Sequence, residues 1–150
     1  MSAASLRPGL RPGLRIAGYA SVFGRPDKGG DVVVRGAFAE AAAPLPLLWQ
    51  HKQDEPIGFV DSLAEDGRGL RITARIVADG RGREAAALVK AGAIDGLSFG
   101  YRVKAASPTR NGRRLERLEL VEVSLVTFPM QGEARVLGWQ EELTDAGSEI

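Results

Sequence analysis

The sequence contains no cysteine and a single histidine among its 150 residues. The absence of cysteine excludes a thiol nucleophile, a disulfide framework and any thiolate metal site. One histidine argues against a histidine-based zinc centre. It also leaves only one candidate, His51, for an imidazole base near neutral pH.

The sequence also has no excess of charge of one sign and no long apolar run. Lysine and arginine number 20 and aspartate and glutamate 19, so net charge gives no argument for nucleic acid or a membrane as the main partner. No apolar run could span a bilayer, and the N-terminus lacks a signal-peptide core, so we expect a cytosolic protein. The length and the 44% hydrophobic content predict one globular domain with a real core.

Both ends of the sequence differ from the middle. Residues 6–15 read LRPGLRPGLR, and this density of proline and glycine predicts a flexible basic arm over residues 1–15. Its three arginines could touch phosphate, but a solvated arm is the expectation, and nucleic acid is not expected as a partner. Residues 139–150 have the composition of an acidic mobile tail, which leaves residues 16–138 as the folded domain.

The sequence of residues 16–138 predicts mainly strands, with two short helices. An alanine-rich helix is expected over residues 37–43 and a second over 82–91, with Gly92 as its stop. Two of the strands, over 57–63 and 70–77, are separated by a turn sequence and predict a hairpin. The other expected strands cover residues 16–23, 32–34, 45–51, 96–103 and 113–127, with a short edge segment at 132–137.

Ser98 stands out because of its setting. Residues 96–103 alternate apolar with small or polar side chains, so Ser98 points away from the apolar face of a strand. Gly96 and Gly100 remove side chains from the same face, which would let another backbone approach. The simpler interpretation is a serine that faces solvent on an amphipathic strand.

His51 and Glu122 each allow two interpretations. His51 ends the predicted strand 45–51 on the face of Leu47 and Trp49, as a packed histidine or as a base. Glu122 lies in a strand that is apolar on both faces, where an isolated buried charge is costly. Its partner is therefore either an arginine, in a structural ion pair, or an imidazole.

Serine, histidine and a carboxylate are the parts of an activated hydroxyl nucleophile. Composition alone does not bring the three residues together. Ser124 is a rival nucleophile because it lies two residues from Glu122 on the same strand face. A different hydrolase, with Glu122 and either Asp95 or Asp31 in acid–base chemistry, is another alternative.

From about residue 16 to residue 136, the chain resembles the Caudovirus prohead protease family, the serine proteases that mature tailed-phage capsids. The blocks that carry the resemblance occur in the order of the family. They are Gly18-Tyr19-Ala20-Ser21-Val22-Phe23, Asp31, Arg35-Gly36-Ala37-Phe38, Leu48-Trp49-Gln50-His51, Ile57-Gly58, Gly69-Leu70, Gly96-Leu97-Ser98-Phe99-Gly100-Tyr101 and Glu122-Val123-Ser124-Leu125-Val126-Thr127-Phe128-Pro129.

The resemblance implies a fold similar to the herpesvirus assemblins: α+β, mainly β, with a small antiparallel β-barrel flanked by short helices. It implies His51 as general base, Ser98 as nucleophile and Glu122 as the acid that orients the imidazole. The glycines and the family block favour Ser98 over Ser124. The sequence does not assign the oxyanion hole. Backbone N–H groups are expected to form it, and Arg135 is one arginine that could assist them. No metal or organic cofactor is implied.

The implied activity is that of an endopeptidase. It would cut the scaffolding segment of a major capsid protein inside an assembling head in the bacterial cytoplasm, in a phage or a gene-transfer agent. Cleavage of its own ends is a further hypothesis, and a homodimer is expected because assemblin-like relatives act as dimers. The alternative function is a non-catalytic capsid-assembly or scaffold-binding module on the same fold.

Overall fold

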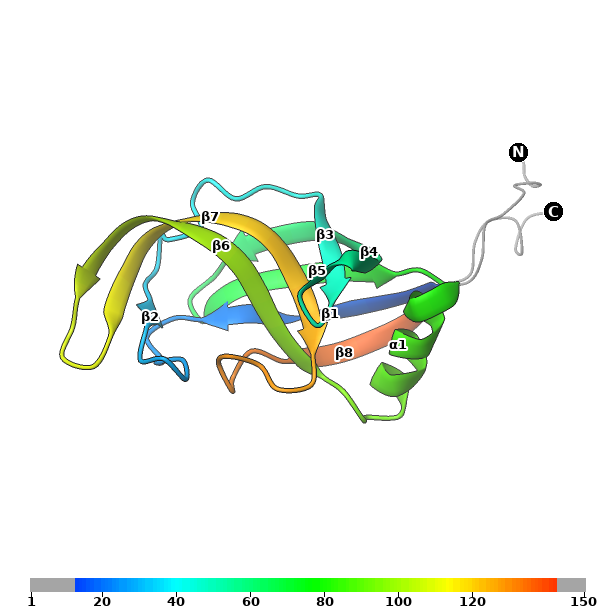
Figure 1. The fold of residues 1–150 in the computed structure, drawn as a ribbon. Coiled ribbons are helices and arrows are strands. Elements are labelled where there is room, and N and C mark those ends of the chain that lie inside the picture. Colours follow the sequence, from blue (N-terminus) through cyan, green and yellow to red (C-terminus); the bar gives the residue numbers. More distant parts are fainter. Residues whose placement is uncertain (1–12, 143–150) are drawn as a thin grey trace.

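The strands of residues 13–142, the range that this computed structural model describes, form one eight-stranded sheet with a single helix beside it (Figure 1). The strand order is β2–β7–β3–β4–β5–β1–β8, and β6 pairs with β7. Most neighbours are antiparallel, but β7 runs parallel to β2 and β3. The predicted mainly β fold is confirmed. The elements are β1 (Gly13–Val22), β2 (Val32–Val33), β3 (Leu45–Trp49), β4 (Lys52–Glu65), β5 (Gly69–Ile76), α1 (Gly80–Lys90), β6 (Gly96–Pro108), β7 (Arg113–Val126) and β8 (Val136–Glu142).

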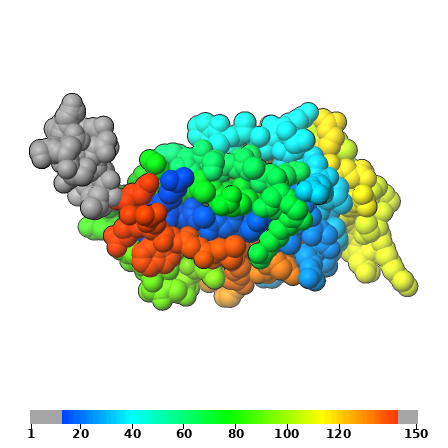
Figure 2. Space-filling model, turned by 180° about the vertical axis from the view of Figure 1, so that it is seen from behind, coloured from blue at the N-terminus to red at the C-terminus, as the bar shows by residue number. Residues whose placement is uncertain are grey.

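The sheet is open, so the predicted barrel is not supported. Its ends approach each other where the start of β6 meets the segment before β8. There Leu97 N–H donates to the Ala134 carbonyl (3.0 Å) and Val136 N–H donates to the Asp95 carbonyl (2.8 Å). This contact is an isolated bridge rather than a ladder. The rest of β6 stays with β7 in a long hairpin whose yellow tip projects from the body in Figures 1 and 2.

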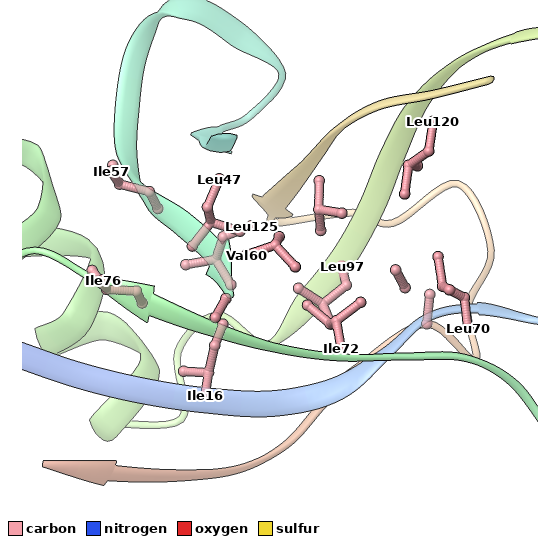
Figure 3. Close-up of a cluster of buried hydrophobic side chains, with 14 of the residues drawn as sticks. Ile16, Leu47, Ile57, Val60, Leu70, Ile72, Ile76, Leu97, Leu120 and Leu125 are labelled. Carbon is pink, nitrogen blue, oxygen red and sulfur yellow. The ribbon is translucent and has the colours of Figure 1, made fainter. Parts of the chain in front are cut away.

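The core lies against the strands that carry the candidate site residues. Figure 3 shows side chains from β1, β3, β4, β5, β6 and β7 meeting in one cluster. Leu97 on β6 and Val123 and Leu125 on β7 are fully buried in it. Helix α1 adds Ala85 and Val89. Because Ser98 and Glu122 each adjoin one of these core residues, packing fixes the backbone that presents them.

Helix α1 is confirmed, and its end follows from one glycine. Gly92 has a φ of +77°, which places it in the left-handed region that glycine adopts freely. Its N–H donates to the Val89 carbonyl (3.0 Å), and Ala93 N–H donates to the Leu88 carbonyl (2.9 Å). These are the two bonds of a Schellman motif, which stops the helix. The β4–β5 hairpin is also confirmed.

The alanine-rich segment 37–43 does not form the predicted helix. Glu65 on β4 accepts the N–H groups of Gly36 and Phe38 through its two carboxylate oxygens, at 2.8 Å each. Phe38 and Ala37 are buried in the core. A side chain from another strand therefore satisfies backbone donors here, and packing holds the segment in successive turns despite its helical propensity.

The ends of the described range are strands. β8 pairs with β1 through Glu142, past the predicted domain end at residue 138, and β1 begins at Gly13, inside the predicted arm. Residues 1–12 and 143–150 lie outside the described residues, so the rest of the predicted arm and acidic tail stays a prediction. None of the helical structure within residues 13–142 is long and apolar enough to cross a membrane.

Candidate active site

His51 lies in a two-residue turn between β3 and β4, not on the predicted strand. Gln50 and His51 have φ values of +54° and +62°, which residues other than glycine rarely adopt. Positive φ at both central residues is the pattern of a type I′ hairpin turn. Each such residue costs on the order of 1 kcal/mol, so contacts around the turn must hold it in place.

The end of β7 supplies those contacts. His51 N–H donates to Ser124 Oγ (3.0 Å), and Gln50 N–H donates to the Leu125 carbonyl (3.0 Å). The Gln50 side chain also binds Thr127: its Nε2 donates to Oγ1 (2.7 Å) and its Oε1 accepts the Thr127 N–H (3.2 Å). β7 thus fixes where the histidine stands.

Glu122 on the same strand contacts the imidazole directly. Its Oε2 lies 2.6 Å from His51 Nδ1, and its Oε1 accepts the Ser124 hydroxyl at 2.7 Å. Glu122 is 8% exposed, and of the two partners that the sequence left open it pairs with the imidazole. This hydrogen bond raises the pKa of His51 above its usual range, against the opposite effect of burial.

Ser98 lies opposite Ser124 in the β6–β7 ladder, and Gly100 lies opposite Glu122. Residues paired across an antiparallel ladder project from the same face, so Ser98, Ser124 and Glu122 share one face. Ser98 is 7% exposed, so it is not the solvent-facing serine of the simpler interpretation. Within residues 13–142 its hydroxyl has no hydrogen-bond partner.

One pocket of about 220 Å³ joins the serine to the histidine. Ser98 and His51 both line it. Since Glu122 occupies His51 Nδ1, the nitrogen left for a second partner is Nε2. The structure therefore brings His51 and Glu122 into contact and places His51 and Ser98 on the same pocket.

Ser124 has a role that the sequence did not show. Its side chain is fully buried, its hydroxyl hydrogen goes to Glu122, and its oxygen accepts the N–H of His51. It does not belong to the pocket lining. These two bonds favour a positioning role over that of the rival nucleophile. The spacing of two residues from Glu122 was the available signal.

The other sequence candidates have partners of their own. Asp31 pairs with Arg113 (2.8 Å), and Asp95 pairs with Arg135 (2.7 Å), so each carboxylate has an arginine partner. Arg135 Nε also donates to the Gly132 carbonyl (2.9 Å), and Arg135 does not line the pocket that Ser98 and His51 share, so its suggested part in an oxyanion hole stays a prediction. In the described part of the chain, no three side chains of metal-binding type gather to hold an ion.

Gly100 is required by the carboxylate opposite it. A Cβ at this position would lie 2.4 Å from Glu122 Oε2 and 3.0 Å from its Cδ. We expect Gly100→Ala to displace the carboxylate from His51 and to lower the pKa of His51 toward its ordinary value of about 6.5. Because the chain contains one histidine, an NMR titration of the imidazole C–H signals measures this directly.

Gly138→Ala is the matched control for that substitution. Gly138 also lies on a strand, and a Cβ there would meet nothing within 4 Å. The pKa of His51 should be unchanged in this variant. An unchanged pKa in Gly100→Ala would mean that the carboxylate keeps its place, and that close packing against Gly100 does not hold it.

Comparison with known proteins identifies relatives over most of the chain. The family model described as Caudovirus prohead serine protease matches residues 9–147. The prohead protease of Enterobacteria phage HK97 is 36% identical over 131 residues, which cover 79% of this chain and 57% of that protein. The capsid polyprotein of Pseudomonas phage PAJU2 is 34% identical over 130 residues, 81% of this chain and 19% of that protein. The chain thus spans only part of both curated relatives.

Solved structures show the same fold at low identity. The capsid assembly protease of bacteriophage T4 superposes with a TM-score of 0.63 at 19% identity, over 82% of this chain and 87% of that one. The protease of KSHV, in complex with a hexapeptide phosphonate inhibitor, also superposes with a TM-score of 0.63. The two chains are 16% identical, and the match covers 85% of this chain and 65% of that one. With a family match that covers nearly its whole length, the chain belongs to the Caudovirus prohead serine protease family.

Proposed function

We propose that this chain is a serine endopeptidase, with Ser98 as nucleophile, His51 as general base and Glu122 as the acid that orients the imidazole. One observation carries the proposal: Glu122 binds His51 Nδ1 at 2.6 Å, while His51 shares a pocket with the unpartnered hydroxyl of Ser98. A hydroxyl nucleophile needs a base beside it and a third group behind that base. The family match supports the same chemistry.

In the acylation step, Ser98 Oγ attacks the carbonyl carbon of the scissile peptide bond. Its proton passes to His51 Nε2, and the carbonyl oxygen takes up the negative charge. When the tetrahedral intermediate collapses, the C–N bond breaks and the imidazolium gives its proton to the departing amine. The product is an ester of Ser98 and a peptide with a free amino terminus.

Water completes the cycle. His51 takes a proton from a water molecule, whose oxygen attacks the ester carbon, and the proton returns to Ser98 Oγ as the C–O bond breaks. Glu122 accepts the Nδ1–H throughout, which keeps Nε2 free to accept protons and stabilises the imidazolium. The raised pKa of His51 is the measurable sign of that stabilisation.

The proposed substrate is the scaffolding segment of a major capsid protein, inside an assembling phage head. Relatives named prohead protease and capsid polyprotein, and a fold neighbour named capsid assembly protease, support this substrate class. Confinement in a shell would raise the encounter rate between enzyme and substrate. Cleavage of its own ends and a homodimer belong to the same proposal.

Co-expression with the major capsid protein of the same phage or gene-transfer agent tests the function. We expect intact-mass measurement to show that the capsid protein loses a terminal segment when the natural chain is present and keeps it with Ser98→Ala. Shortening that persists with the alanine variant would point to another nucleophile or a host enzyme. Particles that form with uncut capsid protein in both cases would favour the non-catalytic assembly module.

A further inference from the structure

The pocket beside Ser98 contains polar groups that have no partner within the described chain. Ser21 on β1 is 1% exposed, and its hydroxyl is buried without a hydrogen bond. The Tyr101 hydroxyl on β6 and Oδ2 of Asp27, in the loop after β1, likewise have no hydrogen-bond partner in residues 13–142. A buried polar group without a partner calls for an explanation, and a bound ligand is one.

These groups are oxygens that can accept hydrogen bonds, and Asp27 adds a carboxylate that Arg113 attracts only at a distance. Asp31, on the same pocket, is paired with Arg113. Asp27 forms no ion pair within the described residues; its Oδ1 accepts only the backbone N–H groups of Gly29 and Asp31. The pKa of Tyr101 is raised, by burial first and then by Asp31 and Asp27, against a smaller opposite effect of Arg113, so the negative potential of the aspartates dominates at the phenol.

The remaining walls are apolar except for Gln131, whose amide is bonded to the backbone of Val22 and Arg25, and the volume suits a single side chain. Leu97, Phe99, Leu115 and Met130 line the pocket together with the polar groups. At about 220 Å³ it is smaller than the 300 Å³ or so at which drug-sized sites begin. Lysine and arginine combine an apolar stem with a cationic head that donates several hydrogen bonds. A carboxylate would face Asp27, and an aliphatic side chain would leave Ser21 unpaired.

We propose that this pocket binds the lysine or arginine side chain of the substrate residue whose carbonyl carbon Ser98 attacks. The proposal rests on the proposed function. The cation would lie against Asp27, with the hydroxyls of Ser21 and Tyr101 as further acceptors, and its stem would pack on the apolar walls. Cleavage would then follow basic residues.

A peptide library measures this preference. Peptides from a bacterial proteome, cut with a glutamate-specific protease so that lysine and arginine remain internal, are incubated with the full chain, and the new ends are identified by mass spectrometry. We expect lysine and arginine to be enriched about tenfold at the residue before the cut. Asp27→Asn keeps an oxygen for the N–H groups of Gly29 and Asp31 but removes the charge, and it should abolish most of the enrichment.

Glu119→Gln is the matched control. It also removes one carboxylate, but from an exposed ion pair with Arg102 (3.3 Å) on the β6–β7 hairpin, outside the pocket. The enrichment should be unchanged in this variant. Cleavage without a preference for basic residues, or a preference that survives in Asp27→Asn, would overturn the pocket proposal and leave the protease in place.

A binding measurement decides the case in which no peptide is cut. Addition of n-butylammonium should shift the backbone amide NMR signals of Ser21 and Tyr101, more weakly in Asp27→Asn, whereas neutral n-pentanol should not. Binding without cleavage would support the pocket and count against the proposed function. With no cleavage and no shift by millimolar n-butylammonium, the pocket proposal fails.

Discussion

Replacing Ser98 with alanine is expected to lower kcat for capsid-protein cleavage by about 10⁶-fold, the loss that removal of the nucleophile causes in other serine proteases. The reason is chemical, because the proposed mechanism needs the Ser98 hydroxyl to form the ester intermediate and to pass its proton to the imidazole. Ser124 is the nearest rival, and both of its hydrogen bonds are already committed, to Glu122 and to the His51 N–H. Time courses with purified protein and capsid protein, followed by intact mass, measure the loss.

Ser124→Ala is the informative contrast. It removes the acceptor of the His51 N–H and the hydroxyl that donates to Glu122, so the imidazole is held less firmly. We therefore expect kcat to fall by about 10²-fold although the nucleophile is intact. A fluorophosphonate reagent should add its mass to Ser98 in the natural chain and, more slowly, in Ser124→Ala. Labelling or cleavage that survives in Ser98→Ala but disappears in Ser124→Ala would reverse the assignment.

The sequence predicted helix α1 and the strands other than most of β8 because their signals are local. Alternation of apolar residues, turn residues and a stop glycine lie within a few positions of one another. The turns at 37–43 were mispredicted because the deciding carboxylate, Glu65, lies on a distant strand. The open sheet could not be foreseen either, since closure depends on whether β6 pairs along β8, a long-range choice that residue patterns do not encode.

The candidate site was predicted unevenly for the same reason. The histidine, serine and acid came from a family resemblance, and local patterns alone could not have chosen them. The sequence pattern placed His51 on a strand because Leu47 and Trp49 alternate before it, yet the strand ends at Trp49 and bonds from β7 hold Gln50 and His51 at positive φ. Ser124 was a rival nucleophile because it lies two residues from Glu122 on the same strand face, and the sequence did not show that it accepts the N–H of His51, a residue of a distant turn.

Replacing Glu122 with glutamine is expected to lower kcat by about 10⁴-fold, a loss of the size that an amide in place of the triad acid produces in other serine proteases. Here the neighbouring hydroxyl dictates which way the amide turns. Ser124 Oγ accepts the His51 N–H, and its own hydrogen has the Glu122 side chain as its acceptor, so we expect the amide oxygen to keep that position. The amide NH₂ then faces His51 Nδ1, which becomes an acceptor. The proton moves to Nε2, and the imidazole can no longer take one from Ser98.

The pH dependence separates this explanation from a simple loss of structure. In the natural chain, the Glu122 hydrogen bond raises the pKa of His51, so the acid limb of kcat/KM should lie above the ordinary histidine value of about 6.5. In Glu122→Gln the limb should move to lower pH, because a neutral amide does not stabilise the imidazolium. A residual activity whose acid limb stays in place would rule out Glu122 as the partner that sets the basicity of His51.

The free energy of unfolding should decrease as the pH rises, because the His51–Glu122 pair loses its contribution. A folded-state pKa raised above the unfolded value means that the pair contributes fully below the unfolded pKa of histidine and loses its contribution as the pH rises through the raised value. Denaturant melts across that window should therefore show a decline in the natural chain that is reduced in Glu122→Gln. If the variant kept the full decline while losing activity, the ionic contact would not be the source of the raised pKa, and the tautomer argument would have to stand alone.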